Sequence, residues 1–253
     1  MMDQEVRSEF KSLIKSRISE KIQNYQAESD YKPFFEAIFD KPTIIQASIM
    51  QSLYTSFGMS IYEQMAVTLA SKAGYHAERQ FIIKGSIDDS TRVLIDRICE
   101  KPIGTYSKSA EVEMIRESIE LGEAIEHPDS TADVFVRKPD GEEIFIDITT
   151  VKPNKKESRA LRRKFLVWTA LRLSQDKSLN VSTYMGIPYN PYYPIPYSRS
   201  FVRNNTHESE VLVQEALWSL FAGYDVFDEL LQLFSGVGED MKREISDFLS
   251  QQG

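Results

Sequence analysis

Residues 132–149 read "ADVFVRKPDGEEIFIDIT", and this stretch decides the fold. Two runs rich in β-branched and aromatic residues, "ADVFVRK" and "EEIFIDIT", flank the tripeptide Pro139-Asp140-Gly141. Such runs favour β-strands. Proline presets φ and glycine supplies a positive φ, which together are typical of a tight turn. The stretch therefore predicts an antiparallel β-hairpin.

The hairpin places two carboxylates opposite each other. If the turn centres on Asp140, residues pair when their numbers sum to 280, so Asp133 faces Asp147 with Cβ atoms about 5 Å apart. A one-residue bulge at Gly141 would loosen this register. Alternation along the strands puts both acids on the face that also carries Phe135, Phe145 and Thr149. The opposite face carries Val134, Val136, Ile144, Ile146 and Ile148.

Two facing carboxylates in apolar surroundings repel each other and lose hydration, so something must stabilise them. Three explanations are open. An arginine or lysine partner would make a structural ion network, and a shared proton would make an acid–base pair. A divalent cation is the third, and magnesium suits a site with few carboxylates and a substrate phosphate.

A basic segment follows the hairpin, although the whole chain has a net charge of −8. Between Lys152 and Arg172 there are eight basic residues and one acid, Glu157. A local basic band can meet phosphates while the rest of an acidic chain repels them. Helical geometry gathers five of these residues on an arc of about 120°, where they could follow a DNA backbone. These are Lys155, Lys156, Arg159, Arg162 and Arg163. The alternative is an ordinary solvated helix face.

The remaining pattern predicts an α/β fold: a small mixed sheet, built as hairpin, helix and strand, surrounded by helices. The helix covers roughly 155–173, and "VSTYMGIPYNP" (181–191) is the next strand, expected to run parallel to the second hairpin strand. Apolar spacing indicates further helices at about 6–22, 44–73 with a possible break at Gly58, 88–100, 109–126 and from 208 onward. Gly223, Gly236 and Gly238 are expected at helix ends.

Composition gives broad limits. Cys99 is the single cysteine, which excludes an internal disulfide and suits the cytoplasm. The first residues, "MMDQEVRSEFKSLIKSR", are too charged for a signal peptide. The uncharged run from Thr43 to Tyr62 contains seven Gln, Ser or Thr side chains besides its first residue, so we expect a buried helix and no membrane span.

The hairpin carboxylates followed by a helix and a strand resemble the core of the PD-(D/E)xK nuclease superfamily, with "PDSTAD" and "DIT" as the matching motifs. Three longer strings narrow the resemblance: "SLYTSFGMSIYEQMAVTLA" (52–70), "DITTVKPNK" (147–155) and "IPYNPYYPIPYSR" (187–199). Together they look like the TdeIII-type family of type II restriction endonucleases over about residues 30–250. The resemblance implies one restriction-endonuclease-like domain (1–253), with a mainly helical part (1–126), a catalytic core (127–190) and a recognition loop with C-terminal helices (191–253).

The family resemblance also implies an activity. A magnesium-dependent homodimer would hydrolyse double-stranded DNA at GGNCC, with two-fold protein symmetry matching a palindromic target. Asp133 and Asp147 would hold Mg²⁺. Glu63 in "SIYEQ" is the candidate for a further metal ligand, and its alternative is an exposed helix acid.

Thr149 departs from the family pattern, which resembles Asp-Ile-Lys-Thr-Val-Lys-Pro-Asn. The missing lysine would orient the attacking water and steady charge on the phosphorane. Threonine supplies no cation, so either Lys152 or a second metal takes over, or the chain has impaired cleavage and keeps metal and DNA binding. The latter would be a DNA-binding protein that shifts duplex without cutting it. A structure-directed nuclease of the same superfamily, cutting without a fixed sequence, is a further alternative.

The segment "YNPYYPIPYSRSFVRNN" (189–205) is the candidate for reading bases. Prolines stiffen a loop, tyrosines offer flat surfaces, and arginine reads guanine in the major groove. We expect DNA contacts from Asn190, Tyr192, Arg199 and Arg203. The alternative is a Pro/Tyr loop packed on the core or on a dimer partner.

Overall fold

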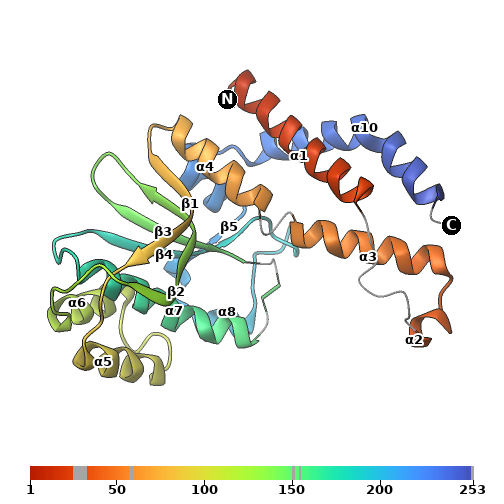
Figure 1. The fold of residues 1–253 in the computed structure, drawn as a ribbon. Coiled ribbons are helices and arrows are strands. Elements are labelled where there is room, and N and C mark those ends of the chain that lie inside the picture. The colour runs from red at the N-terminus through yellow and green to blue at the C-terminus, as the bar shows by residue number, and fades with distance from the viewer. Residues whose placement is uncertain (25–32, 57–59, 150–151, 154, 252–253) are drawn as a thin grey trace. The chain divides into compact units, whose positions relative to one another are not determined.

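The structure is a computed structural model that describes residues 1–24, 33–56, 60–149, 152–153 and 155–251 (Figure 1). Of these, residues 56, 129, 155–159, 249 and 251 are described by their backbone alone. The chain divides into two compact units, Ala66–Asp225 and a second unit made of Met1–Met65 and Val226–Gly253. These boundaries differ from the three segments that the sequence indicated. A single domain therefore stays a prediction.

The larger unit contains a mixed five-stranded sheet in the order β1-β2-β3-β4-β5. β1, β2 and β3 are antiparallel neighbours, whereas β3, β4 and β5 run parallel. The α/β class with a mixed sheet surrounded by helices is confirmed, and so is the parallel pairing of β3 with β4. The strands are β1 (His76–Lys84), β2 (Glu126–Arg137), β3 (Glu143–Ile148), β4 (Val181–Ile187) and β5 (Val211–Val213).

The hairpin of β2 and β3 has the expected register. Val134 pairs with Ile146 and Phe135 with Phe145, so paired numbers sum to 280. Gly141 has a φ of 90°, and the turn is closed by the Lys138 amide, which donates to the Glu142 carbonyl at 2.9 Å. The turn chemistry of the sequence is therefore confirmed, because glycine adopts the left-handed conformation that this turn needs.

One face of the sheet is covered by α7 (Lys155–Leu173), on which α5 (Asp89–Glu100) and α6 (Lys108–Ser118) pack in turn (Figure 1). An aromatic row crosses this face: Phe135 stacks on Phe145 with centroids 5.1 Å apart, and Phe145 meets Trp168 of α7 at 6.5 Å. All three side chains are buried. This row fixes how α7 lies on the strands that carry the two aspartates.

The opposite face is covered by α9 (Glu215–Ala222). A Cβ added to Gly186 on β4 would lie 3.0 Å from Leu217 of α9 and 3.2 Å from Ile146 of β3. The helix can approach the sheet this closely because Gly186 has no side chain. Val134, Val136, Ile144 and Ile146 are buried on this face as the alternation predicted.

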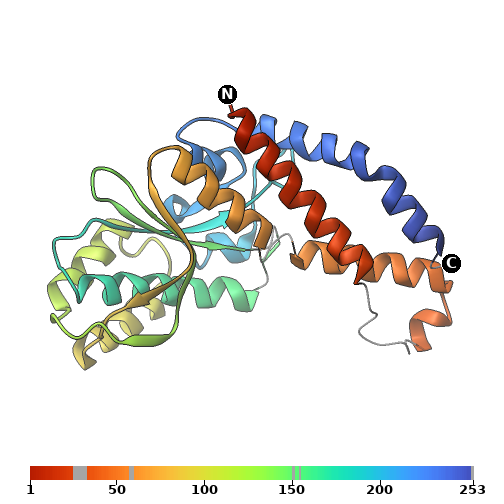
Figure 2. The same cartoon turned by 45° about the horizontal axis from the view of Figure 1, so that its top comes forward.

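The smaller unit is helical. α1 and α10 lie side by side in both views (Figures 1 and 2), joined by ion pairs from Arg7 to Glu229 and from Lys15 to Asp240. Its helices are α1 (Gln4–Gln23), α2 (Pro33–Glu36), α3 (Lys41–Ser56) and α10 (Phe227–Gln251), and α4 (Tyr62–Lys72) crosses the boundary between the units. Gly236 and Gly238 lie inside α10, so their prediction as helix ends is wrong.

Several elements differ from the sequence expectation. β1 and β5 were not expected, and β2 begins at Glu126, where the sequence favoured a helix through 126. The helix α6 ends at Ser118. Gly223 does end a helix, with a φ of 76°. The predicted break at Gly58 lies outside the described residues. The remaining short elements are α8 (Ser200–Arg203) and the 3₁₀ turn η2 (Glu208–Glu210).

Candidate active site

Asp133 lies where the hairpin strands stop pairing. The ladder of β2 and β3 reaches Val134–Ile146 and does not include the next pair in register, Asp133 with Asp147. Instead, the Ile148 amide donates to Asp133 Oδ2 at 2.7 Å. The Asp133 carboxylate thus takes the place of a main-chain acceptor at the end of the ladder. The hydrogen bond fixes the orientation of the carboxylate and gives the Ile148 amide an acceptor.

Asp147 has a cationic partner from the covering helix. Lys164 of α7 forms an ion pair with Asp147 Oδ1, and its Nζ lies 4.8 Å from the centroid of Trp168. Both charged side chains are largely buried, with exposed fractions of 15% for Asp147 and 28% for Lys164. A partly desolvated pair beside an aromatic ring is held more firmly than a surface pair. The structure therefore shows a lysine partner for Asp147.

Gln80 on β1 adds an amide to the same site. Its Nε2 donates a long hydrogen bond of 3.4 Å to Asp133 Oδ1. The next residue, Phe81, stacks on Phe135 of the same face, with ring centroids 4.3 Å apart. A regular strand would send two neighbours to opposite faces. Gln80 has a φ of 48°, a conformation that costs a non-glycine residue energy and that clusters at functional sites.

Thr149 and Lys152 have other contacts in the structure. The Thr149 amide donates to the Gly186 carbonyl at 3.0 Å, which continues the β3–β4 pairing beyond β3. Lys152 lies with Nζ 5.8 Å from the ring centroid of Tyr192. Lys164, not Lys152, contacts Asp147 in this structure, and the replacement of the missing lysine by Lys152 stays a prediction.

Glu63 lies in the first turn of α4 and is 2% exposed. The alternative that it is an exposed helix acid is therefore wrong, and its role as a metal ligand stays a prediction. In the part of the chain that the structure describes, no group of three or more His, Cys, Asp or Glu side chains is arranged to hold a metal.

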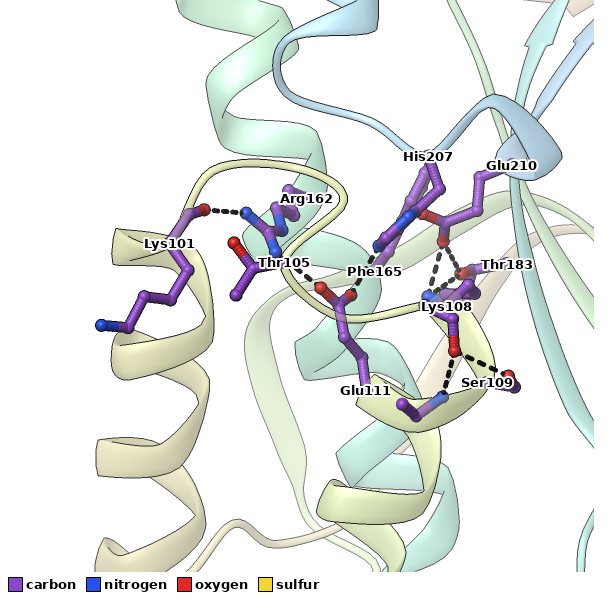
Figure 3. Close-up of polar contacts among 12 residues, drawn as sticks. Lys101, Thr105, Lys108, Ser109, Glu111, Arg162, Phe165, Thr183, His207 and Glu210 are labelled. Carbon is purple, nitrogen blue, oxygen red and sulfur yellow. Dashed lines mark hydrogen bonds and ion pairs between the residues drawn. The ribbon is translucent and has the colours of Figure 1, made fainter.

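The basic helix differs from the expected phosphate-facing surface. Arg162 is 6% exposed and donates to Glu111 Oε1 at 2.5 Å and to the Lys101 carbonyl at 2.6 Å (Figure 3). His207 Nε2 lies 3.0 Å from the other oxygen of the same carboxylate. The prediction that Arg162 contacts DNA is wrong, because α5 and α6 cover its side of α7.

Other members of the basic band are also paired. Arg163 forms an exposed ion pair with Asp96, and Arg172 donates to the buried Glu143 at 2.5 Å. Exposed pairs are weak and exchange easily, so a phosphate contact of Arg163 stays a prediction. The side chains of Lys155, Lys156 and Arg159 lie outside the described residues.

The loop after β4 is tied to Pro153, which precedes α7. Arg199 donates to the Tyr192 hydroxyl at 3.1 Å and to the Pro153 carbonyl at 3.2 Å. Asn190 donates to the Ile195 carbonyl at 2.8 Å and accepts from the Tyr192 amide at 3.0 Å. These side chains shape the loop in the structure, whereas Arg203 at the end of α8 is exposed.

Tyr197 completes this cluster. Its ring lies 5.9 Å from that of Tyr192, and its hydroxyl, like Arg199 Nε, is buried with no hydrogen-bond partner among the described residues. Burial raises the pKa of Tyr197 to about 12, against the opposing effect of the Arg199 charge. In the protein without DNA, Tyr197 of this loop packs against the core, as the alternative of a Pro/Tyr loop packed on the core predicts. Base reading by the loop stays a prediction.

Sequence reasoning missed Lys164 and Gln80. Lys164 had a detectable signal, because it is four residues before Trp168 and so follows the helix face that packs on the sheet. Gln80 had none, since nothing in "HAERQFIIK" indicates a positive φ at its fifth residue.

A comparison with known protein families places the whole chain. The family model described as "Type II restriction endonuclease, HinfI" matches residues 2–238. The chain belongs to the HinfI family of type II restriction endonucleases. The narrower TdeIII-type assignment and the PD-(D/E)xK superfamily stay predictions.

The chain is also similar to individual type II restriction enzymes, at 24–26% sequence identity. The type II restriction enzyme HgiCII of Herpetosiphon aurantiacus is 26% identical over 227 residues, which cover 87% of this chain and 82% of the relative. HgiEI of the same organism is 26% identical over 233 residues, covering 88% and 83%. The type II restriction enzyme MjaII of Methanocaldococcus jannaschii is 24% identical over 210 residues, covering 78% and 56%. No solved structure matches the chain.

Among the described residues, no helix has the length and apolarity required to cross a membrane. The helix α3, which covers most of the uncharged run from Thr43 to Tyr62, is mostly exposed, so the expected buried helix is wrong for this part.

Proposed function

We propose that this protein is a magnesium-dependent type II restriction endonuclease that hydrolyses phosphodiester bonds in double-stranded DNA. The observation that carries the proposal is the cluster of Asp133, Asp147 and Lys164 at the end of the hairpin. It combines two oriented carboxylates with one cation. The chain that carries it belongs to a family of type II restriction endonucleases. Family membership supports the class of reaction, and the cluster of Asp133, Asp147 and Lys164 supports the position of the active site.

The donor set suits magnesium. Mg²⁺ binds through one or two carboxylates and completes its shell with water and substrate phosphate. Asp133 and Asp147 would hold the ion, with Glu63 as a further candidate. When bound, the ion would polarise the phosphodiester and favour a deprotonated water. The Gln80 amide keeps Asp133 oriented from the other side of its carboxylate.

Lys164 supplies the positive charge that Thr149 lacks. In the hydrolysis, a water oxygen attacks phosphorus, and the bond to one bridging ester oxygen breaks. Negative charge builds up on the other phosphate oxygens, which an ammonium group stabilises in a site of low polarity. The Lys164 ammonium group is fixed by Asp147 and Trp168, so it is present at the carboxylates before DNA arrives.

The target site remains a proposal from the resemblance. A TdeIII-type enzyme would act at GGNCC as a homodimer, because a palindrome is read by a two-fold protein. Arg203 is exposed and available for a base edge. Arg199, Tyr192 and Asn190 hold the loop in shape, and Arg199 would reach DNA after leaving one of its two present acceptors.

The test is digestion of a sequenced plasmid with the purified protein and Mg²⁺, followed by mapping of the ends. We expect discrete fragments whose ends share one short palindrome, and no cleavage with EDTA. Ends without a common sequence would indicate a structure-directed nuclease. Cleavage that persists in EDTA would contradict the metal requirement.

A second function is favoured by Thr149 alone. A chain that binds DNA without cutting would shift a labelled duplex in Ca²⁺ or Mg²⁺ and leave it intact. The Thr149→Lys variant separates the two functions, because fast cleavage by this variant beside an inactive native protein would establish the non-cutting alternative.

A further inference from the structure

The helices α2 and α3 of the smaller unit expose a series of large apolar side chains. Their exposed fractions lie between 48% and 84%. They start in α2, continue through the turn that links it to α3 and reach the last turn of α3. We name this set the α2–α3 apolar surface, and its members are Phe34, Phe35, Ile38, Phe39, Met50 and Tyr54.

This exposure is unusual for a helix pair. α3 has sixteen residues, and Ile49 is its one buried apolar side chain within the described part of the chain. By contrast, α10 of the same unit buries Leu230, Leu233, Val237 and Met241. Contiguous apolar patches of several hundred Å² on a soluble protein mark interaction sites.

The chemistry of the surface excludes DNA as the occupant. Residues 33–56 contain one cation, Lys41, and two acids, Glu36 and Asp40. A phosphate backbone requires several Lys or Arg side chains. The occupant must therefore offer apolar surface in return.

The area fits a dimer. With about 200 Å² for each large side chain, the exposed fractions correspond to roughly 750 Å² per copy, close to the ~800 Å² per partner of a standard interface. A two-fold interface brings the same patch of both copies together. An apolar and nearly uncharged patch complements itself, whereas a charged patch would repel its own copy.

We infer that the α2–α3 apolar surface is where a second copy of this chain docks. The inference rests on the proposed function, because a palindromic target requires two copies. It adds which part of the chain pairs them: the smaller unit forms the dimer, and the larger unit carries the carboxylates.

The test is the mass of the protein in solution, measured by light scattering after gel filtration at several concentrations. We expect the native chain at twice 29.1 kDa. Ile38→Asp and Phe34→Ser should shift the mass to that of one chain and leave the far-UV circular dichroism unchanged, since both side chains are exposed. The matched controls are Leu121→Asp and Leu231→Asp, exposed apolar residues in the larger unit and in α10, which should stay dimeric.

The outcomes separate the inference from the proposed function. A native dimer that becomes monomeric in Ile38→Asp supports the inference even when no cleavage is seen. A native monomer that cuts plasmid at a palindrome overturns the inference and leaves the function standing. Variants that stay dimeric also overturn it, whether or not they melt earlier than the native protein, because another surface would then join the two copies.

Discussion

Lys164 of α7 forms an ion pair with Asp147 of β3, although the two residues lie seventeen positions apart. The pair joins the covering helix to the strand that carries the acid. It exists because Phe145, Phe165 and Trp168 fix the helix on the sheet.

Replacing Lys164 with methionine should abolish most cleavage. Loss of one group that stabilises charge in the transition state costs about 10²–10³-fold in rate. The K164M variant should still bind the cognate duplex in Ca²⁺, measured by gel shift, because the proposed base-reading residues are in the loop after β4. K101M is the control, since the Lys101 side chain is exposed and points away from the Glu111 cluster (Figure 3). Equal single-turnover rates for K164M and the native protein would remove Lys164 from the site.

The backbone at Gln80 predicts an inverted order of two small substitutions. Glycine usually weakens a strand relative to alanine, but at a φ of 48° glycine is the less strained residue. We expect Gln80→Ala to have a free energy of unfolding about 1 kcal/mol lower than Gln80→Gly, measured by urea denaturation. Both variants lose the amide that contacts Asp133 and should cut more slowly. A Gln80→Ala variant more stable than Gln80→Gly would contradict the strained conformation.

The buried arginine and its exposed neighbour should behave differently. Arg162→Ala leaves Glu111 buried with a lost partner, which costs about 3–5 kcal/mol of unfolding free energy. Arg163→Ala breaks an exposed pair with Asp96 and should cost no more than about 1 kcal/mol. Thermal unfolding of both variants compares them directly. A small change in unfolding free energy for Arg162→Ala would mean that the contacts of Glu111 with Arg162 and His207 are not formed in solution.

Asp88 predicts a pH-dependent contribution to stability. Burial raises the pKa of this N-cap carboxyl, but hydrogen bonds from Ser90, Thr91 and the Glu120 amide outweigh it and hold the pKa well below 3.8. A lowered folded pKa stabilises the protein above the unfolded value, and this stability is lost as the pH falls below 3.8. Asp88→Ala should therefore cost about 1 kcal/mol at pH 7 and less below pH 3.

The neighbouring Asp89 is the control for this experiment, because its side chain is 98% exposed. Asp89→Ala should change the melting temperature little at either pH. If Asp88→Ala and the native protein differ by the same amount at pH 7 and pH 3, the carboxylate is not held in its charged form by the cap.

The hairpin could be predicted from the sequence because its information is local. Alternation fixes which residues face which side, and Pro139 and Gly141 fix the turn and thus the register. The same local pattern places Asp133 and Asp147 on one face of the hairpin.

The partners of charged residues could not be predicted, because they depend on tertiary packing. Helical geometry places Arg162 on an arc with Arg163, yet α6 covers one and leaves the other exposed. β1 and β5 were missed for a related reason: β5 has three residues and β1 contains several charged side chains, so neither has a strong strand signal.

The role of Lys164 is tested most directly by single-turnover cleavage, with Mg²⁺, of a duplex carrying the mapped site. The native protein, K164M, T149K and the double variant T149K/K164M are compared. We expect that the native protein cuts, that K164M is at least ~100-fold slower, and that T149K/K164M recovers much of the rate by restoring a lysine on the same face. A native protein that leaves the duplex intact while T149K alone cuts it fast would contradict the role of Lys164.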